Sequence, residues 1–301
     1  MTTAPIIYEE AVARNLGLVS PEEQRALAQL RVGLPGLGGV GGIYSQTLVR
    51  FGVRRFHLAD FDNFDVGNLQ RQFCATAHTI GQPKAEVVER GILDVDPGAE
   101  VKRFDAGITE QSLDPFLDCV DVVLDGLEFF ELPMRRRLFN RAYERGIPVI
   151  TCAPLGFSAA LLVFAPGGMR FDDYFDIDDD TPPLDALASF AVGLAPRPSH
   201  LKYLDLRHVD MTKRRGPAVA PSVVLCAAVA CTELFRLCCG KGGLRPVPCY
   251  AQLDLLRCTW RRGRLRFGVR GPVPRLVRAV MLRRLRAQAK LLDAGDHAEE
   301  G

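Results

Sequence analysis

Two cationic side chains, Arg71 and Lys84, follow a glycine-rich run in the first third of the chain. The run fits the spacing G-x-G-x-x-G, and its glycines are Gly36, Gly38, Gly39 and Gly41. Glycines at this spacing let backbone amides and a helix N-terminus approach phosphate oxygens. An arginine and a lysine beside such a loop can offset the charge that develops on phosphorus as pyrophosphate leaves. These residues therefore predict a nucleoside triphosphate site.

An acidic residue, Asp60, ends the strand that is predicted after the glycine run. A carboxylate at that position can accept hydrogen bonds from ribose hydroxyls. An NAD-dependent oxidoreductase would begin in the same way, with a glycine loop and an acid. Hydride transfer has no evident use for Arg71 and Lys84, so the two cations disfavour that alternative.

Regular elements alternate along the first half of the chain. Ser20, Pro21 and Glu23 form the pattern of a capped helix start. We expect strands over 31–34, 54–60, 101–104, 121–125, 147–152 and 157–164, and helices over 20–30, 43–51, 81–94 and 131–145. This alternation predicts an α/β fold with a Rossmann-like, doubly wound, mostly parallel sheet. A buried helix over 221–239 and short strands over 250–255 and 265–267 predict a mixed sheet in the C-terminal half.

Five regions follow from these elements. We expect an N-terminal helical arm over 1–30, a nucleotide-binding Rossmann-like core over 31–170 and a crossover loop over 171–215. Residues 216–268 complete the same domain, and 269–301 form a basic helix, over about 275–292, and a tail. The crossover segment is irregular and rich in Asp and Pro. Long loops of this kind are usually functional or disordered, which predicts a solvated, mobile segment.

Composition limits the class of protein. The 301 residues are 48% hydrophobic and 25% charged, as in ordinary globular chains. The longest apolar run, Val223 to Cys231, is too short to cross a bilayer, and no secretory signal opens the chain. We therefore expect a cytoplasmic protein with reduced cysteines. The net charge of +2 conceals a basic end, because residues 260–301 hold ten arginines and one lysine against four acids.

With these residues the chain resembles the E1-like activating enzymes of the ThiF, MoeB and HesA group. The resemblance runs from about residue 14 to 164, and more loosely to 253. It rests on five motifs in order: Gly36-Leu37-Gly38-Gly39-Val40-Gly41, Asp60-Phe61-Asp62, Asn68-Leu69-Gln70-Arg71-Gln72, Ile80-Gly81-Gln82-Pro83-Lys84 and Asp94-Val95-Asp96-Pro97. Members use ATP and Mg²⁺ to adenylate a carboxylate, commonly the C-terminus of a ubiquitin-like protein, and generally act as homodimers.

The resemblance implies roles for individual residues. Gly39 would meet the phosphates and Asp60 the ribose, with Asp62 in the same motif. Asn68, Arg71 and Lys84 would hold the triphosphate, and Gln72 completes their motif. Arg14 is the candidate for the arginine that members send into the neighbouring subunit's ATP site.

Two features depart from the family pattern. Glu128 stands where members carry their magnesium-binding aspartate, so we expect Glu128 to hold Mg²⁺ with altered geometry or slower adenylation. Asp125 is the neighbouring carboxylate that could be structural or could partly substitute. No pair of C-x-x-C motifs occurs, so no zinc is expected. A cysteine thioester would need a nucleophilic cysteine near the adenylate, but the crossover segment holds no cysteine and Cys152 is expected to pack against its neighbours. We therefore expect the chemistry to end at the acyl adenylate.

Three alternatives remain open for the substrate and the activity. One branch of the superfamily also lacks the C-x-x-C pairs and acts on a modified adenosine carboxylate in tRNA, and an arginine-rich tail suits a phosphate backbone. The aromatic residues of that tail, Trp260 and Phe267, are isolated, which indicates no stacking platform. A small peptide is another substrate class. A catalytically weakened binding scaffold is the third alternative, supported by Glu128 and by the degenerate motif around Arg14.

Overall fold

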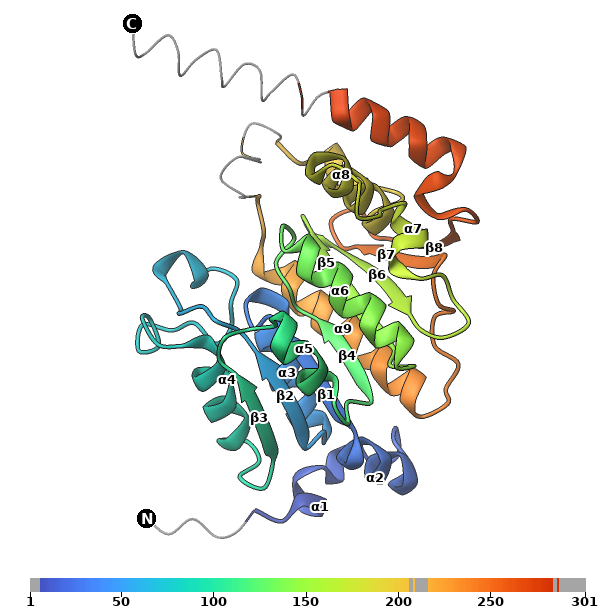
Figure 1. Ribbon diagram of the computed structural model, residues 1–301. Coiled ribbons are helices and arrows are strands. Elements are labelled where there is room, and N and C mark those ends of the chain that lie inside the picture. The colour runs from blue at the N-terminus through green and yellow to red at the C-terminus, as the bar shows by residue number, and fades with distance from the viewer. Residues whose placement is uncertain (1–5, 206–207, 209–215, 284–285, 287–301) are drawn as a thin grey trace, which may run out of the picture.

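The computed structural model describes residues 6–205, 208, 216–283 and 286. Eight strands form one sheet in the order β3-β2-β1-β4-β5-β6-β7-β8 (Figure 1). The strands are β1 (Arg31–Pro35), β2 (Arg55–Ala59), β3 (Glu100–Phe104), β4 (Val122–Asp125), β5 (Val149–Leu155), β6 (Ser158–Phe164), β7 (Cys249–Asp254) and β8 (Thr259–Arg264). Neighbouring strands from β3 to β5 are parallel, and those from β5 to β8 are antiparallel. The predicted Rossmann-like α/β fold with a mixed C-terminal half is confirmed.

The last strand is not where the sequence placed it. β8 spans Thr259–Arg264, not 265–267, and it forms a hairpin with β7 in which Asp254 pairs with Thr259. The reason is that β8 is an edge strand with exposed arginines, so it lacks the apolar alternation that marks a strand.

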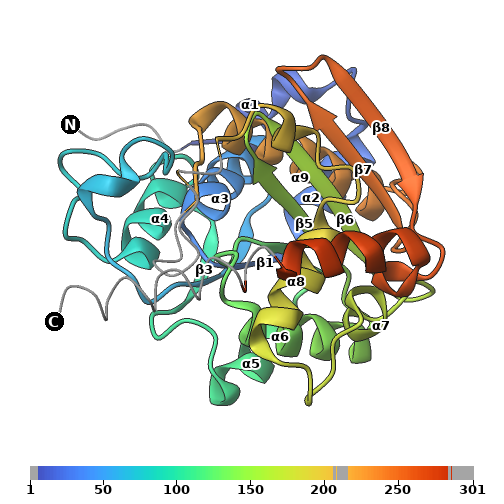
Figure 2. The same ribbon diagram turned by 90° about the horizontal axis from the view of Figure 1, so that it is seen from above.

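Helices cover both faces of the sheet (Figures 1 and 2). On one face, α3 (Gly39–Phe51), α4 (Lys84–Leu93) and α9 (Ala220–Cys238) enclose a core with the strands. On the other face lie α5 (Glu110–Leu117), α6 (Leu132–Glu144), α7 (Phe171–Phe175) and α8 (Pro183–Leu194). Near the N-terminus are α1 (Tyr8–Ala11) and α2 (Pro21–Gln29). The Ser20 hydroxyl accepts from the Glu23 amide at 3.2 Å, so the predicted cap of α2 is confirmed.

Among the residues that the structure describes, one helix, α9, is long and apolar enough to cross a membrane by length and composition alone. Central helices of soluble proteins meet the same criteria. In this structure α9 packs against α3, β5 and β6, and Cys226 and Leu234 on it are fully buried.

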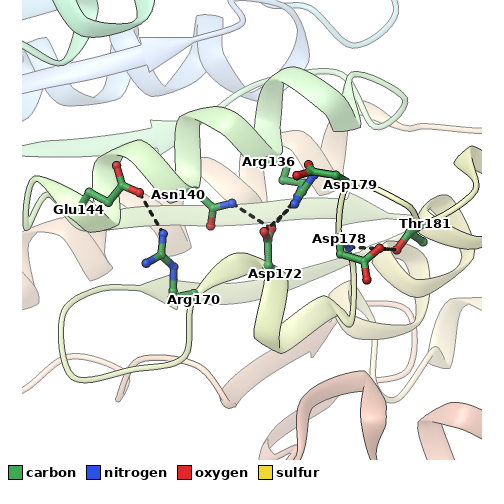
Figure 3. Close-up of polar contacts among 8 residues, drawn as sticks. All are labelled: Arg136, Asn140, Glu144, Arg170, Asp172, Asp178, Asp179 and Thr181. Atoms are coloured by element: carbon green, nitrogen blue, oxygen red, sulfur yellow. Dashed lines mark hydrogen bonds and ion pairs between the residues drawn. The ribbon is translucent and has the colours of Figure 1, made fainter.

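The crossover segment is more regular than the sequence indicated. It contains α7, α8 and the 3₁₀ helix η3 (Ser199–Lys202), while residues 206–207 and 209–215 lie outside the described part of the chain. Its aspartates bind cations of α6: Arg136 pairs with Asp172 at 2.8 Å and with Asp179 at 2.6 Å, and Asn140 donates to Asp172 (Figure 3). The prediction of an irregular loop was wrong over α7 and α8, because the sequence does not show that an arginine-bearing helix lies opposite Asp172 and Asp179. Asp178, Asp179 and Asp180 are exposed, as predicted for a solvated segment.

Candidate active site

The glycine loop joins β1 to α3 at the carboxyl end of the sheet. Gly36 has a φ of +81°, a backbone conformation that residues with a side chain rarely adopt. Gly126, in the turn after β4, lies directly against the Gly36 carbonyl, and a Cβ atom at Gly41 would overlap that same carbonyl. α3 begins at Gly39 and points its N-terminal amides into this loop. The glycines therefore allow the loop to pack closely, and they also leave the N-terminal amides of α3 accessible to a ligand.

Alanine substitutions should separate these two roles. A Cβ atom at Gly39 would meet only Val223, at an ordinary 3.6 Å. We expect Gly39→Ala to leave the thermal unfolding midpoint nearly unchanged and to weaken Mg-ATP binding about tenfold or more. Gly41→Ala should lose ATP binding and also about 1–3 kcal/mol of the free energy of unfolding, because the loop must shift. Urea denaturation and calorimetric titration measure the two effects, and equal stability of both variants would contradict this assignment.

An acidic side chain supports the loop from β2. Asp60 follows that strand, and its two carboxylate oxygens accept hydrogen bonds from the amides of Leu37 at 2.6 Å and Asp62 at 2.9 Å. Burial raises the pKa of Asp60, and the nearby Lys84 opposes that shift. Asp60 is therefore fixed beside the glycine loop, as a ribose-binding carboxylate must be.

Lys84 is a buried cation at the start of α4. Its side chain is 8% exposed, and its Nζ atom lies 2.8 Å from Asp62 Oδ2. Its backbone amide also donates to the Asp62 carbonyl, at 2.9 Å. The ion pair holds the Lys84 ammonium against Asp62, close enough to Asp60 for its charge to oppose the rise in the pKa of Asp60.

Asn68, Arg71 and Gln72 lie in and after the short 3₁₀ helix η2 (Val66–Asn68). Asn68 is buried, and its carbonyl accepts from the amides of Arg71 and Gln72 at 3.1 and 2.8 Å. Arg71 donates to the Gly67 carbonyl at 3.1 Å and forms no salt bridge within the part of the chain that the structure describes. Its positive charge is thus available to an anion.

Gln72 connects this segment to the glycine loop. A Cβ atom at Gly38 would lie 3.3 Å from Gln72 Nε2, so the amide lies beside the loop. Gln72 Oε1 is buried and has no hydrogen-bond partner among the described residues. A buried acceptor without a donor is costly, and a hydroxyl or amino group of a bound nucleotide can supply the missing donor, whereas its phosphate oxygens cannot. The loop and its surroundings therefore fit a bound nucleotide.

The turn after β4 brings Glu128 to the same edge of the sheet. Glu128 is exposed, and its Oε2 atom accepts from the Phe130 amide at 2.8 Å. Asp125 is buried instead, and Arg135 Nε and the Thr151 hydroxyl hold its Oδ2 atom at 3.0 and 2.8 Å. Asp125 is engaged in a structural ion pair, so Glu128 is the more available carboxylate. Among the described residues no group of three or more His, Cys, Asp or Glu side chains could hold a metal.

Comparison with known proteins identifies the family. The sequence matches the ThiF family over residues 12–267. The chain belongs to the ThiF family. Its relatives include the tRNA threonylcarbamoyladenosine dehydratase of Bacillus subtilis, 32% identical over 46% of this chain and 54% of that protein. The molybdopterin-synthase adenylyltransferase of Salmonella typhimurium is 31% identical over 48% of this chain and 57% of that protein. This ThiF-family chain thus spans about half the length of these curated relatives.

Solved structures agree on the fold. PaaA superimposes with a TM-score of 0.64 at 16% identity, over 88% of this chain and 76% of that one. Escherichia coli MccB, in complex with MccA-N7isoASN, superimposes with a TM-score of 0.64 at 17% identity, over 89% of this chain and 74% of that one. At these identities the likeness extends to the fold alone.

Arg14 is the predicted site residue that the structure does not bring to the loop. It is exposed on the 3₁₀ helix η1 (Ala13–Asn15). Its neighbour Asn15 donates to the Phe51 carbonyl at 3.3 Å, and Tyr8 donates to Gly52, so this segment lies at the C-terminal end of α3. The glycine loop lies at the other end of that 13-residue helix, about 20 Å away. Within one chain, Arg14 therefore stays apart from Arg71.

The buried cysteines of this ThiF-family chain are poor nucleophiles. Cys152 is 1% exposed in the middle of β5, so it does not lie at the strand end that the sequence indicated. Burial raises the pKa of Cys226 and Cys231 strongly, and raises that of Cys74 to about 11 and that of Cys238 to about 12. A raised pKa disfavours the thiolate, which is the nucleophilic form, so these four cysteines, Cys74, Cys226, Cys231 and Cys238, are packing residues.

Thiol labelling should follow exposure. At pH 8, Cys119 and Cys258 are exposed and should react quickly with an aromatic disulfide reagent. Cys152, Cys226 and Cys231 should react only after unfolding in guanidinium chloride. Mass spectrometry of the labelled peptides identifies each site, and rapid labelling of Cys152 in the folded protein would contradict its placement in the core.

The sequence reasoning missed the residues that hold the Glu128 turn. Arg135 is buried, and besides Asp125 it binds the carbonyl of Leu127 at 2.5 Å and that of Glu128 at 3.0 Å. The only signal in the sequence was a run of three arginines at 135–137. The helical period within α6 decides which of the three points inward, and the run alone does not show it.

Proposed function

We propose that this protein is an ATP-dependent adenylyltransferase that activates a carboxylate as an acyl adenylate and releases pyrophosphate. The observation that carries the proposal is the convergence of Asp60, Lys84 and Gln72 on one glycine loop. ThiF-family relatives named as adenylyltransferases support it. The reaction consumes one ATP and joins the carboxylate oxygen to the α-phosphorus.

Each residue has a proposed task in that reaction. The amides at the start of α3, between Gly38 and Gly41, bind the phosphate oxygens, and Asp60 accepts from the ribose hydroxyls. Arg71, with Asn68 and Gln72 beside it, and Lys84 offset the charge that grows on the triphosphate as the carboxylate attacks in line. These groups are fixed before the substrate binds, so little reorganisation is needed during the reaction.

We assign Mg²⁺ to Glu128. A magnesium ion commonly uses one or two carboxylates together with phosphate oxygens and water, and Glu128 is an exposed carboxylate on the turn that packs against the glycine loop. When bound, the ion supplies positive charge to the phosphates. Glu128→Ala should therefore raise the Mg²⁺ concentration needed for half-maximal pyrophosphate exchange, and undiminished exchange would contradict the assignment.

The substrate we propose is the C-terminus of a ubiquitin-like protein or of a peptide. Relatives named sulfur carrier protein ThiS adenylyltransferase and solved complexes of MccB with MccA support these classes. We place the enzyme in the cytoplasm, in keeping with the free cysteines of the described chain.

We also propose a homodimer in which Arg14 of one subunit reaches the ATP site of the other. The distance of Arg14 from its own glycine loop supports this arrangement. Sedimentation gives the oligomeric state. Mixing Arg14→Ala subunits with Arg71→Ala subunits should restore part of the activity, because one of the two hybrid sites keeps both arginines.

The central experiment is calorimetric titration of Mg-ATP, followed by pyrophosphate exchange with candidate carboxylates. Micromolar binding of ATP, and exchange of labelled pyrophosphate that depends on a carboxylate, are the expected results. If the protein binds no Mg-ATP, the adenylyltransferase proposal fails and the chain is a binding scaffold with this fold.

A second candidate is the adenylation of a carboxylate carried on RNA. The relative named tRNA threonylcarbamoyladenosine dehydratase, 32% identical over 140 residues, favours it. Pyrophosphate exchange in the presence of bulk tRNA, compared with exchange in the presence of peptides, distinguishes the two substrates. Stimulation by tRNA alone would favour the RNA-borne carboxylate.

A further inference from the structure

Unpaired positive charge gathers along β8, at the edge of the sheet. Five exposed arginines there form no salt bridge within the described part of the chain: Arg257, Arg261, Arg262, Arg264 and Arg266. Residues 257–267 are called the β8 ridge below. Beyond it, Arg270 and Arg278 bind Asp176 and Arg286 binds Asp185, while Arg275 and Arg283 form no salt bridge within the described part of the chain. Among the described residues, the free charge therefore lies on β8 more than on the basic C-terminal helix, which the structure describes over 272–283.

Two exposed aromatic rings belong to the same ridge. Trp260 is 68% exposed and Phe267 is 58% exposed. The guanidinium carbon of Arg262 lies 5.9 Å from the centre of the Trp260 ring, and that of Arg266 lies 5.5 Å from the centre of the Phe267 ring. The sequence indicated no stacking platform here because these rings are isolated in the chain. In the structure each ring has an arginine beside it, a pairing that the sequence alone did not indicate.

The strand geometry places charge and ring in one row. Side chains alternate between the faces of a strand, so Trp260, Arg262 and Arg264 share one face of β8. Same-face neighbours lie about 7 Å apart along the strand. β7 pairs with β8 on one side, and β8 ends the sheet order, so its other edge faces away from the sheet. Trp260, Arg262 and Arg264 are all exposed, so the row itself is accessible to an extended ligand.

We propose that the β8 ridge binds a single-stranded segment of RNA, with phosphates on Arg262 and Arg264 and a base stacked on Trp260. Arginine matches phosphate through its planar fork of donors. Exposed aromatic rings beside arginines provide the stacking surface that single-stranded nucleic acids use. An acidic peptide would use the charges and leave the ring without a role. The choice of RNA as the ligand rests on the second candidate function, and the β8 ridge gives that function a binding surface.

The test uses the full chain and a fluorescein-labelled 12-nucleotide single-stranded RNA of mixed sequence. Anisotropy gives the dissociation constant at several salt concentrations. We expect Arg262→Glu/Arg264→Glu to weaken binding more than tenfold and to lower the salt slope by about 1.4, about 0.7 for each lost phosphate contact. Trp260→Ala should weaken binding about fivefold or more without changing the slope. The matched control, Arg50→Glu/Arg90→Glu, changes the same charge at exposed sites on α3 and α4 and should leave binding unchanged.

Three results would overturn the proposal. The first is that the protein binds no RNA at low salt, and the second is that the control variant loses as much RNA binding as Arg262→Glu/Arg264→Glu. The third is that poly-glutamate displaces the RNA while Trp260→Ala still binds RNA fully, a result that would favour an acidic peptide. Mg-ATP titration of every variant separates this surface from the active site. RNA binding in a protein that binds no Mg-ATP would refute the adenylyltransferase proposal and leave the β8 ridge standing.

Discussion

Replacing Arg71 by alanine is expected to weaken Mg-ATP binding about 100-fold or more, with little change in thermal stability. The loss is large because the Arg71 guanidinium forms no salt bridge within the described chain and is free to bind phosphate. Removing one preorganised donor to a developing charge commonly costs 100- to 1000-fold in rate, about 2.7–4 kcal/mol. Pyrophosphate exchange should therefore fall by a similar factor.

Lys84→Ala should have an effect of the same order, for a related reason. Its ammonium is buried with Asp62, so the variant removes a cation and also leaves a carboxylate near the phosphates. Arg90→Ala is the matched control, because Arg90 is an exposed cation on the same helix, bound to Gln82. Isothermal calorimetry of wild type and the three variants makes the comparison. Micromolar binding of ATP by both Arg71→Ala and Lys84→Ala would refute the site.

The local features that the sequence revealed are those that depend on near neighbours in the chain. The Ser20 cap, the glycine loop between β1 and α3, and the alternation of strands and helices all rest on spacings of a few residues. Such spacings reflect backbone geometry directly, so they could be predicted without knowing the packing.

Features that depend on distant partners could not be predicted in this way. Two acids of the crossover segment, Asp172 in α7 and Asp179 in the turn after it, are explained by Arg136 on α6, more than 30 residues earlier. The position of β8 is set by its pairing with β7, because its own side chains are mainly arginines. Neither feature leaves a periodic pattern in its own segment, so propensity alone misplaces both.

The site shows the same division. The sequence motifs located Asp60 after β2, Lys84 at the start of α4 and Glu128 after β4, and the structure gives them their partners. Only the three-dimensional structure distinguishes the surroundings of Asp125 from those of Glu128. Both are acids near the end of β4, yet one is 3% exposed and bound to Arg135, and the other is exposed.

Arg135→Ala is expected to lower the free energy of unfolding by about 3–5 kcal/mol, the usual cost of leaving one member of a buried ion pair without its partner. Arg135 and Asp125 are both almost fully buried, and their side chains lie 3.0 Å apart. Arg137→Ala is the control in the same helix. Arg137 is exposed and pairs with Glu110 at the surface, so its loss should cost less than about 1 kcal/mol. Urea denaturation of both variants provides the comparison.

A double variant tests whether the unpaired charge is the cause. In Arg135→Met/Asp125→Leu no buried charge remains, so much of the lost stability should return. Activity should not return with it, because Arg135 also holds the carbonyls of Leu127 and Glu128. A stable double variant with low pyrophosphate exchange would show that Arg135 positions the Glu128 turn. If Arg135→Ala is as stable as Arg137→Ala, the buried pair does not support the fold as described.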